Sequence, residues 1–102
     1  MKVQLLYFAG CPHVDEARDV LRSALAACGA GDLTVEEVDV QACTTPQQLR
    51  SWGSPTILVD GTDLAGADGP TGLGCRLYPR GTSVAGVPSE ELICATLRQA
   101  MR

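Results

Sequence analysis

The chain has 102 residues and a formal net charge of −4, with 12 acidic and eight basic residues. A chain of this length forms one domain and buries enough surface to fold without a structural metal or disulfide bonds. The basic residues are scattered singly, which argues against nucleic acid or an anionic membrane as the main partner. We therefore expect small molecules or proteins as partners.

The apolar N-terminal run predicts a strand rather than a targeting signal. Residues 2–9 (KVQLLYFA) are rich in branched and aromatic side chains, and no signal-peptide cleavage site follows them. No stretch approaches the roughly 18 apolar residues of a transmembrane helix. These features predict a cytoplasmic protein in which residues 1–102 form a single domain.

The next two elements are a helix and a second strand. Apolar side chains recur at steps of three and four residues over residues 14–28, which predicts an amphipathic helix. Pro12 suits its first turn, where a missing N–H costs nothing, and Gly29 is placed to end it. Residues 33–40 (LTVEEVDV) predict the second strand.

A short helix is predicted over residues 45–53. Thr45 and Gln48 have the spacing of a capping box, and Leu49 and Trp52 share one face. We interpret Trp52 as a packing residue beneath the site, with a place in a substrate groove as the alternative.

The second half of the chain predicts two strands, two turns, a long loop and a last helix. In chain order these are a strand over 56–59, an Asp60–Gly61 turn, a surface loop over 61–74, a strand over 75–79, a turn over 81–86 and a helix over 87–101. The buried stripe of the last helix is predicted to consist of Ile93, Leu97, Ala100 and Met101.

This order of elements, βαβαββα, predicts an α/β fold. The first two strands are expected to run parallel through a right-handed crossover, and the last two to run antiparallel. A mixed four-stranded sheet with helices on both faces follows.

Two landmarks carry a family resemblance. "CPHV" follows the first strand and "SPT" precedes the third, and with them the whole chain resembles the thioredoxin superfamily. The resemblance implies that Cys11 begins the first helix and that Pro55, in the cis form, faces it across the site. "CPH" is similar to the opening of the CPHC motif of DsbA-type oxidants, except that Val14 stands where the second cysteine belongs.

Longer stretches are similar to a set of short bacterial thioredoxin-like proteins, some of which carry an alkylmercury-lyase label. The similarity lies in "YFAGCPHVDEARDVL", "GSPTILVDG" and "GLGCRLY". It implies a thiol/disulfide oxidoreductase, whose catalytic residues here are Cys11, Pro12, His13 and Pro55.

Cys11 suits this chemistry because the thiolate is the reactive form of cysteine and helix N-termini favour it. His13, if protonated and close, would stabilise the thiolate further; alternatively it is only an exposed residue of the first turn. A cis bond at Pro55 would leave the backbone of Ser54 free to pair with an extended partner beside Cys11, whereas an ordinary trans strand entry would not. Ser54, Pro55 and Trp52 are the predicted substrate-binding residues.

Because Val14 replaces the second cysteine, three routes stay open. Cys11 can work alone through mixed disulfides with a low-molecular-weight thiol or a partner protein. It can instead pair with Cys43, which follows a neighbouring parallel strand, or with Cys75, which belongs to the family-like stretch "GLGCRLY". In the third route, converging thiolates capture a soft metal such as mercury, copper(I) or zinc.

The other two cysteines, Cys28 and Cys94, lie on or beside apolar helix faces and are interpreted as packing residues. We expect no cofactor, no resident metal and a monomer. Two other function classes stay open: a non-catalytic binding module that uses the 61–74 loop, and a thiol-based protein that binds soft metals or organomercurials.

Overall fold

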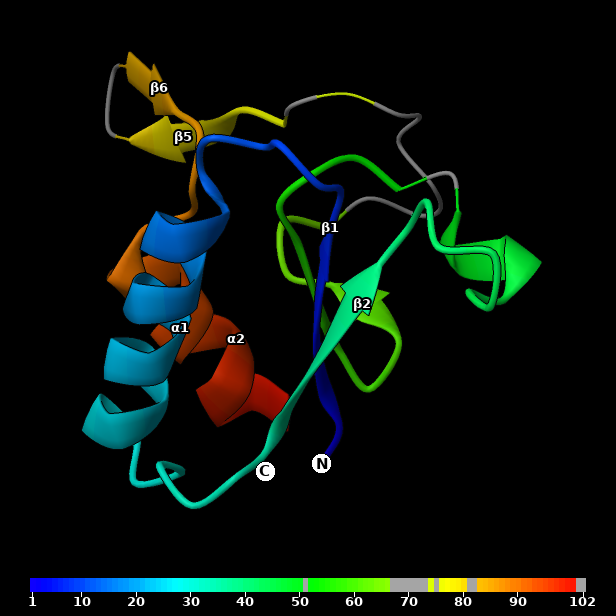
Figure 1. The fold of residues 1–102 in the computed structure, drawn as a ribbon. Coiled ribbons are helices and arrows are strands. Elements are labelled where there is room, and N and C mark those ends of the chain that lie inside the picture. The colour runs from blue at the N-terminus through cyan, green and yellow to red at the C-terminus, as the bar shows by residue number, and fades with distance from the viewer. Residues whose placement is uncertain (51, 67–73, 75, 81–82, 101–102) are drawn as a thin grey trace.

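A computed structural model describes residues 1–50, 52–66, 74, 76–80 and 83–100. The main sheet has four strands in the order β2-β1-β3-β4 (Figure 1). They are β1 (Val3–Tyr7), β2 (Val35–Asp39), β3 (Thr56–Val59) and β4 (Thr62–Asp63). β1 runs parallel to β2 and antiparallel to β3, which in turn pairs antiparallel with β4. The predicted mixed four-stranded sheet of an α/β protein is confirmed.

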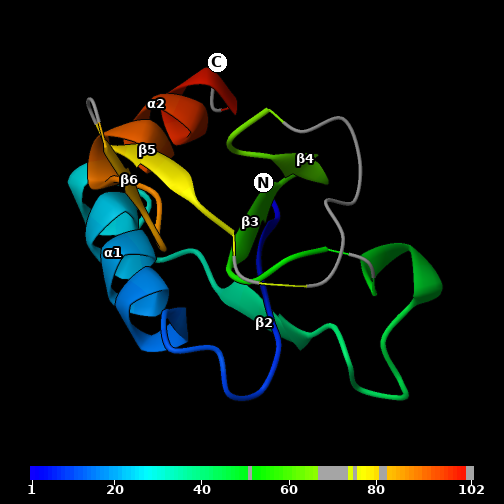
Figure 2. The same ribbon diagram turned by 90° about the horizontal axis from the view of Figure 1, so that it is seen from above.

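Two α-helices, α1 (Val14–Ala27) and α2 (Glu90–Ala100), lie side by side against one face of this sheet (Figures 1 and 2). They enclose the larger core, to which β1 contributes Val3 and Leu5. Because successive side chains of a strand point to opposite faces, Leu6 enters a smaller cluster on the other side, with Val40, Trp52 and Leu58. Helices were expected on both faces, but both α-helices cover the same one.

The predicted helix over residues 45–53 is much shorter in the structure. It forms a single 3₁₀ turn, η1 (Gln47–Leu49), beside the smaller cluster. The predicted capping box is absent because the hydroxyl of Thr45 donates to the carbonyl of Asp39, and Pro46 takes the cap position without a side-chain hydrogen bond. Without that cap, nothing at this end favours extension into an α-helix.

The fourth strand of the sheet is also not the one predicted. Asp60 and Gly61 have φ angles of 52° and 84°, and two consecutive positive values are typical of a tight type I′ hairpin. The chain therefore turns back at once, and β4 occupies the start of the predicted 61–74 loop. The predicted strand over 75–79 instead begins at Tyr78 as β5 (Tyr78–Arg80).

β5 lies outside the main sheet. It pairs antiparallel with β6 (Ser83–Ala85) in a separate two-stranded sheet, so the predicted turn over 81–86 contributes a strand. This hairpin lies close to the N-terminal end of α1 in both views (Figures 1 and 2).

Helix α2 begins behind Ser89, whose hydroxyl accepts the backbone N–H of Leu92 at 3.1 Å. Ile93 and Leu97 are buried as predicted. Ala100 is exposed, which contradicts its prediction, and Cys94 takes its place in the buried stripe; Met101 lies outside the described residues. Over the part of the chain that the structure describes, no helix combines the length and apolar character needed to cross a bilayer.

Candidate functional site

Cys11 is half-buried in the connection between β1 and α1. Gly10 has a φ of 89°, a conformation that favours glycine, and the N–H of Cys11 donates to the carbonyl of Phe8 at 3.2 Å. This turn folds the chain back, so that Cys11 lies just ahead of the N-terminus of α1.

The start of α1 differs slightly from its prediction. The N-cap is His13, with φ −106° and ψ 1°, and the first helical residue is Val14. Pro12 is therefore exposed and lies ahead of the helix rather than in its first turn. Because a residue that precedes proline avoids the helical region, Cys11 is not helical either. Cys11 nevertheless precedes the N-terminal end of α1, and the first N–H groups of a helix have no partner within the helix.

His13 packs against the hairpin of β5 and β6. A Cβ atom added to Gly86, directly after β6, would lie 2.4 Å from Cδ2 and 2.5 Å from Nε2 of His13. The imidazole thus rests on the backbone of Gly86 and is half-buried. His13 is therefore not an exposed residue, and its effect on the Cys11 thiolate stays a prediction.

This contact leads to a prediction for Gly86→Ala. The added methyl group must displace the imidazole, and we expect several-fold slower alkylation of Cys11 by iodoacetamide, matching the effect of His13→Ala. Because the chain has one histidine, its ring signals in a proton NMR spectrum report the displacement directly. Unchanged ring signals in Gly86→Ala would show that the methyl group does not displace the imidazole. An unchanged alkylation rate of Cys11 in His13→Ala would show that His13 does not affect the reactivity of the thiol.

Pro55 lies at the edge of the sheet where β1 ends. The Ser54–Pro55 peptide bond is cis, as predicted. Leu6 pairs with Thr56, so the antiparallel register places Pro55 level with Tyr7, at the strand end from which the chain continues to Cys11. Cys11 and Pro55 thus belong to the same edge of the sheet.

The backbone of Ser54 is not free, contrary to the prediction. Its N–H donates to the carbonyl of Gly74, and its carbonyl accepts the N–H of Arg76, both at 2.9 Å. The chain itself therefore occupies the groups that an extended partner was expected to use. Ser54 is fully buried, and within the described residues its side-chain Oγ has no hydrogen-bond partner.

A buried polar network holds Pro55 and its neighbours. The guanidinium of Arg76 forms two hydrogen bonds with the carboxylate of Asp63, at 2.8 and 3.1 Å, and a third with the hydroxyl of Thr56 at 3.2 Å. The side chain of Asp63 is fully buried and that of Arg76 is 12% exposed. The guanidinium also lies 4.8 Å from the ring centre of Tyr78.

Tyr78 completes this network. It is fully buried, and its hydroxyl donates to the carbonyl of Pro55. Burial raises the pKa of Tyr78 to about 12, so the phenol stays protonated over the physiological range. None of these residues was predicted to matter individually. The only sequence signal was the family-like stretch "GLGCRLY", which contains Arg76 and Tyr78.

Cys43, one of the two predicted partners of Cys11, follows the end of β2. The chain leaving β1 turns toward α1, whereas the chain leaving β2 runs toward η1, and the two segments separate in both views (Figures 1 and 2). Cys11 and Cys43 are both free thiols, and Cys43 is exposed. The two cysteines thus follow strands that end at the same edge of the sheet, and their pairing stays a prediction. Cys75, the other predicted partner, lies outside the described residues.

Trp52 is only 6% exposed and packs in the smaller cluster, which confirms the packing interpretation. It also borders a groove of about 460 Å³, together with Lys2 and Gln4. These two residues stand at the start of β1, the end opposite to Cys11.

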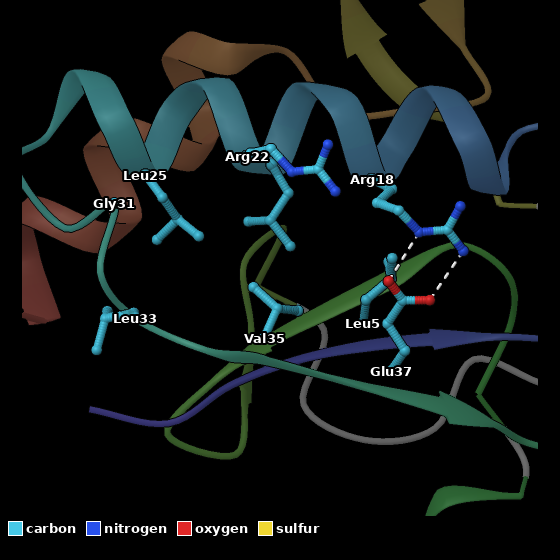
Figure 3. Close-up of a pocket in the computed structure, with 9 residues that line it drawn as sticks. Leu5, Arg18, Arg22, Leu25, Gly31, Leu33, Val35 and Glu37 are labelled. Carbon is cyan, nitrogen blue, oxygen red and sulfur yellow. Dashed lines mark hydrogen bonds and ion pairs between the residues drawn. The ribbon is translucent and has the colours of Figure 1, made fainter.

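A second hollow, of about 280 Å³, lies between α1 and β2 (Figure 3). Its floor is apolar, and its rim carries Arg22 and the pair formed by Arg18 and Glu37 at 2.7 Å. Hydrogen bonding to Arg18 lowers the pKa of Glu37. None of the described residues that line this pocket is a cysteine.

Among the residues that the structure describes, no group of three or more His, Cys, Asp or Glu side chains is arranged to hold a metal ion. Comparisons with protein-family models, with curated proteins and with solved structures found no match for this chain.

Proposed function

We propose that the protein is a thioredoxin-like thiol/disulfide oxidoreductase that acts through Cys11. The observation that carries the proposal is the position of Cys11: a half-buried thiol at the N-terminal end of α1, on the sheet edge to which Pro55 also belongs. Backbone N–H groups at that end of a helix favour the thiolate, which is the attacking form. The mixed sheet behind the site provides a rigid support for both residues.

The reaction proceeds by successive exchanges. The thiolate of Cys11 attacks one sulfur of a disulfide, the S–S bond breaks, and the other sulfur leaves as a thiolate. In the external route, a small thiolate attacks the outer sulfur of the mixed disulfide and restores Cys11, and a second small thiolate releases the remaining half of the original disulfide. In the internal route, the Cys75 thiolate attacks the Cys11 sulfur, expels that half as a thiolate and leaves a Cys11–Cys75 disulfide, which two small thiols then reduce. In both routes two small thiols are oxidised to a disulfide, the original disulfide is reduced to two thiols, and Cys11 ends as a thiol.

The second thiol, which attacks the mixed disulfide, is either a low-molecular-weight thiol or Cys75. Cys75 is favoured among the cysteines of the chain because it belongs to the family-like stretch "GLGCRLY". The external route needs no second cysteine. Replacing Cys75 by serine distinguishes the two routes, because the rate of disulfide reduction falls only if Cys75 supplies the second thiol.

The test is glutathione-dependent reduction of a small disulfide such as hydroxyethyl disulfide. We expect Cys11→Ser to lose all activity above the uncatalysed rate, because serine cannot form the mixed disulfide. Cys43→Ser is the matched control and is expected to keep the activity, since Cys43 is exposed and lies outside the connection between β1 and α1 that carries Cys11. Equal activity in Cys11→Ser and the unaltered protein would refute the proposal.

A further inference from the structure

Two cysteines outside the candidate site lie against each other between the helices. Cys28 caps the C-terminus of α1, and Cys94 lies in the buried stripe of α2. The Sγ of Cys28 is 3.9 Å from the carbonyl oxygen of Cys94. The sulfur of Cys28 at the end of α1 therefore lies beside the backbone of α2.

The reciprocal contact runs through Ala24. Its carbonyl accepts the N–H of Cys28 at 3.0 Å and also the S–H of Cys94 at 3.6 Å. The sulfur of Cys94 thus lies beside the last turn of α1, where Cys28 is located. The sulfur of Cys28 thus contacts the backbone of α2, and the sulfur of Cys94 contacts the backbone of α1. These two contacts bring the thiols close to each other.

Their surroundings differ. Cys94 is 8% exposed, whereas Cys28 is half-buried and more accessible to a reagent. The neighbouring Cys28 thiol and burial together raise the pKa of Cys94 to about 11, so Cys94 is a neutral thiol at physiological pH. Cys28 lies at the C-terminal end of α1 and is the more accessible thiol of the two. Because Cys94 is neutral, the pair is expected to react more slowly than a thiol at a helix N-terminus.

We propose that Cys28 and Cys94 form a second redox-active dithiol, which a low-molecular-weight disulfide oxidises to a cross-link between α1 and α2. The sequence pattern indicated packing for both residues, and both do pack in or against the larger core. Their mutual contact adds a modification site to that role. It is separate from Cys11 and does not depend on the function proposed for it.

The oxidation balances with an external disulfide as the oxidant. The thiolate of Cys28 attacks it and displaces one small thiolate, which leaves a mixed disulfide on Cys28. Cys94 then loses its proton and attacks the Cys28 sulfur, which expels the second small thiolate. Two protein thiols and one small disulfide thus become one protein disulfide and two small thiols.

The cross-link would stabilise the fold. It closes a loop that spans most of the chain, which restricts the unfolded ensemble. For a domain of this size we expect the thermal midpoint to rise by roughly 10 to 20 °C on oxidation.

The experiment uses the full chain with Cys11, Cys43 and Cys75 replaced by serine, treated with oxidised glutathione. Trypsin leaves Cys28 in the peptide 23–50 and Cys94 in the peptide 81–98. We expect these two peptides to be joined, both thiols to resist alkylation after denaturation, and the thermal midpoint to rise. Two free thiols after oxidation would overturn the proposal, as would a lasting glutathione adduct on Cys28 beside a free Cys94.

Two further arms keep the test decisive. In the same background, Cys94→Ala is expected to retain the glutathione adduct on Cys28, because the second attack is lost. If the serine background does not fold, the unaltered protein is mapped instead, with additional cleavage after Glu37 to separate Cys28 from Cys43. There too, the joined peptides support the cross-link, and their absence after complete oxidation of Cys11 contradicts it.

Discussion

Replacing Asp63 by alanine is expected to lower the free energy of unfolding by about 3 to 5 kcal/mol. The carboxylate is fully buried and forms two hydrogen bonds with the guanidinium of Arg76, which is itself 12% exposed. Removal of Asp63 leaves that cation in the interior without its counter-charge. A domain of this size has roughly 5 to 15 kcal/mol of stability, so the loss is a large share of the total.

Denaturant unfolding of three variants checks this expectation. Asp63→Ala combined with Arg76→Met should be more stable than Asp63→Ala alone, because no unpaired charge stays buried. Asp15→Ala is the matched control: Asp15 also pairs with an arginine, Arg18, but its side chain is 93% exposed. That variant should unfold nearly as the unaltered protein does. If Asp63→Ala barely lowered the free energy of unfolding, or if the double variant were no more stable than Asp63→Ala, the buried pair would not stabilise the fold as proposed.

Raising the pH from 10 to 12 is expected to cost the protein about 2 kcal/mol through Tyr78 alone. Burial raises the pKa of Tyr78 from 10.0 to about 12. Over this window the unfolded chain releases the phenolic proton while the folded chain keeps it, which favours unfolding. The contribution is fully present below pH 10 and is lost as the pH rises through the folded pKa.

The test compares the free energy of unfolding at pH 9, 10, 11 and 12 between the unaltered protein and two tyrosine variants. Tyr78→Phe should flatten the decline, whereas Tyr7→Phe, the control at the other tyrosine, should leave it steep. The variant Tyr78→Phe also loses the hydrogen bond to Pro55, so it starts from a lower stability below pH 10. An equally steep decline in Tyr78→Phe would contradict the role assigned to burial.

The elements that the sequence predicted well are those with a strong local pattern. Helix α1 has a regular apolar stripe, and Gly29, which has a positive φ, follows directly after its C-cap, so both signals lie in or beside the helix. The strand over 56–59 is a short apolar run between two turn signals and was found unchanged as β3. Patterns of this kind depend only on neighbouring residues, so they can be read from the chain alone.

The errors arose where distant segments decide the structure. Thr45 looked like a helix cap, but its hydroxyl bonds to Asp39 in the preceding strand segment. The backbone of Ser54 looked available, but Gly74 and Arg76 occupy it from twenty residues or more along the chain. The same limit applies to the site, because no local pattern shows that His13 packs on Gly86 or that Cys28 meets Cys94.

The most direct test of the central claim, that Cys11 is the reactive thiol, is to map the first adduct on the native protein. A brief exposure to a small amount of oxidised glutathione at neutral pH is followed by acid quenching and peptide mass spectrometry. We predict that the glutathione adduct forms first on Cys11, ahead of Cys43, although Cys43 is the more exposed of the two. A first adduct on Cys43, or none on Cys11, would contradict the claim.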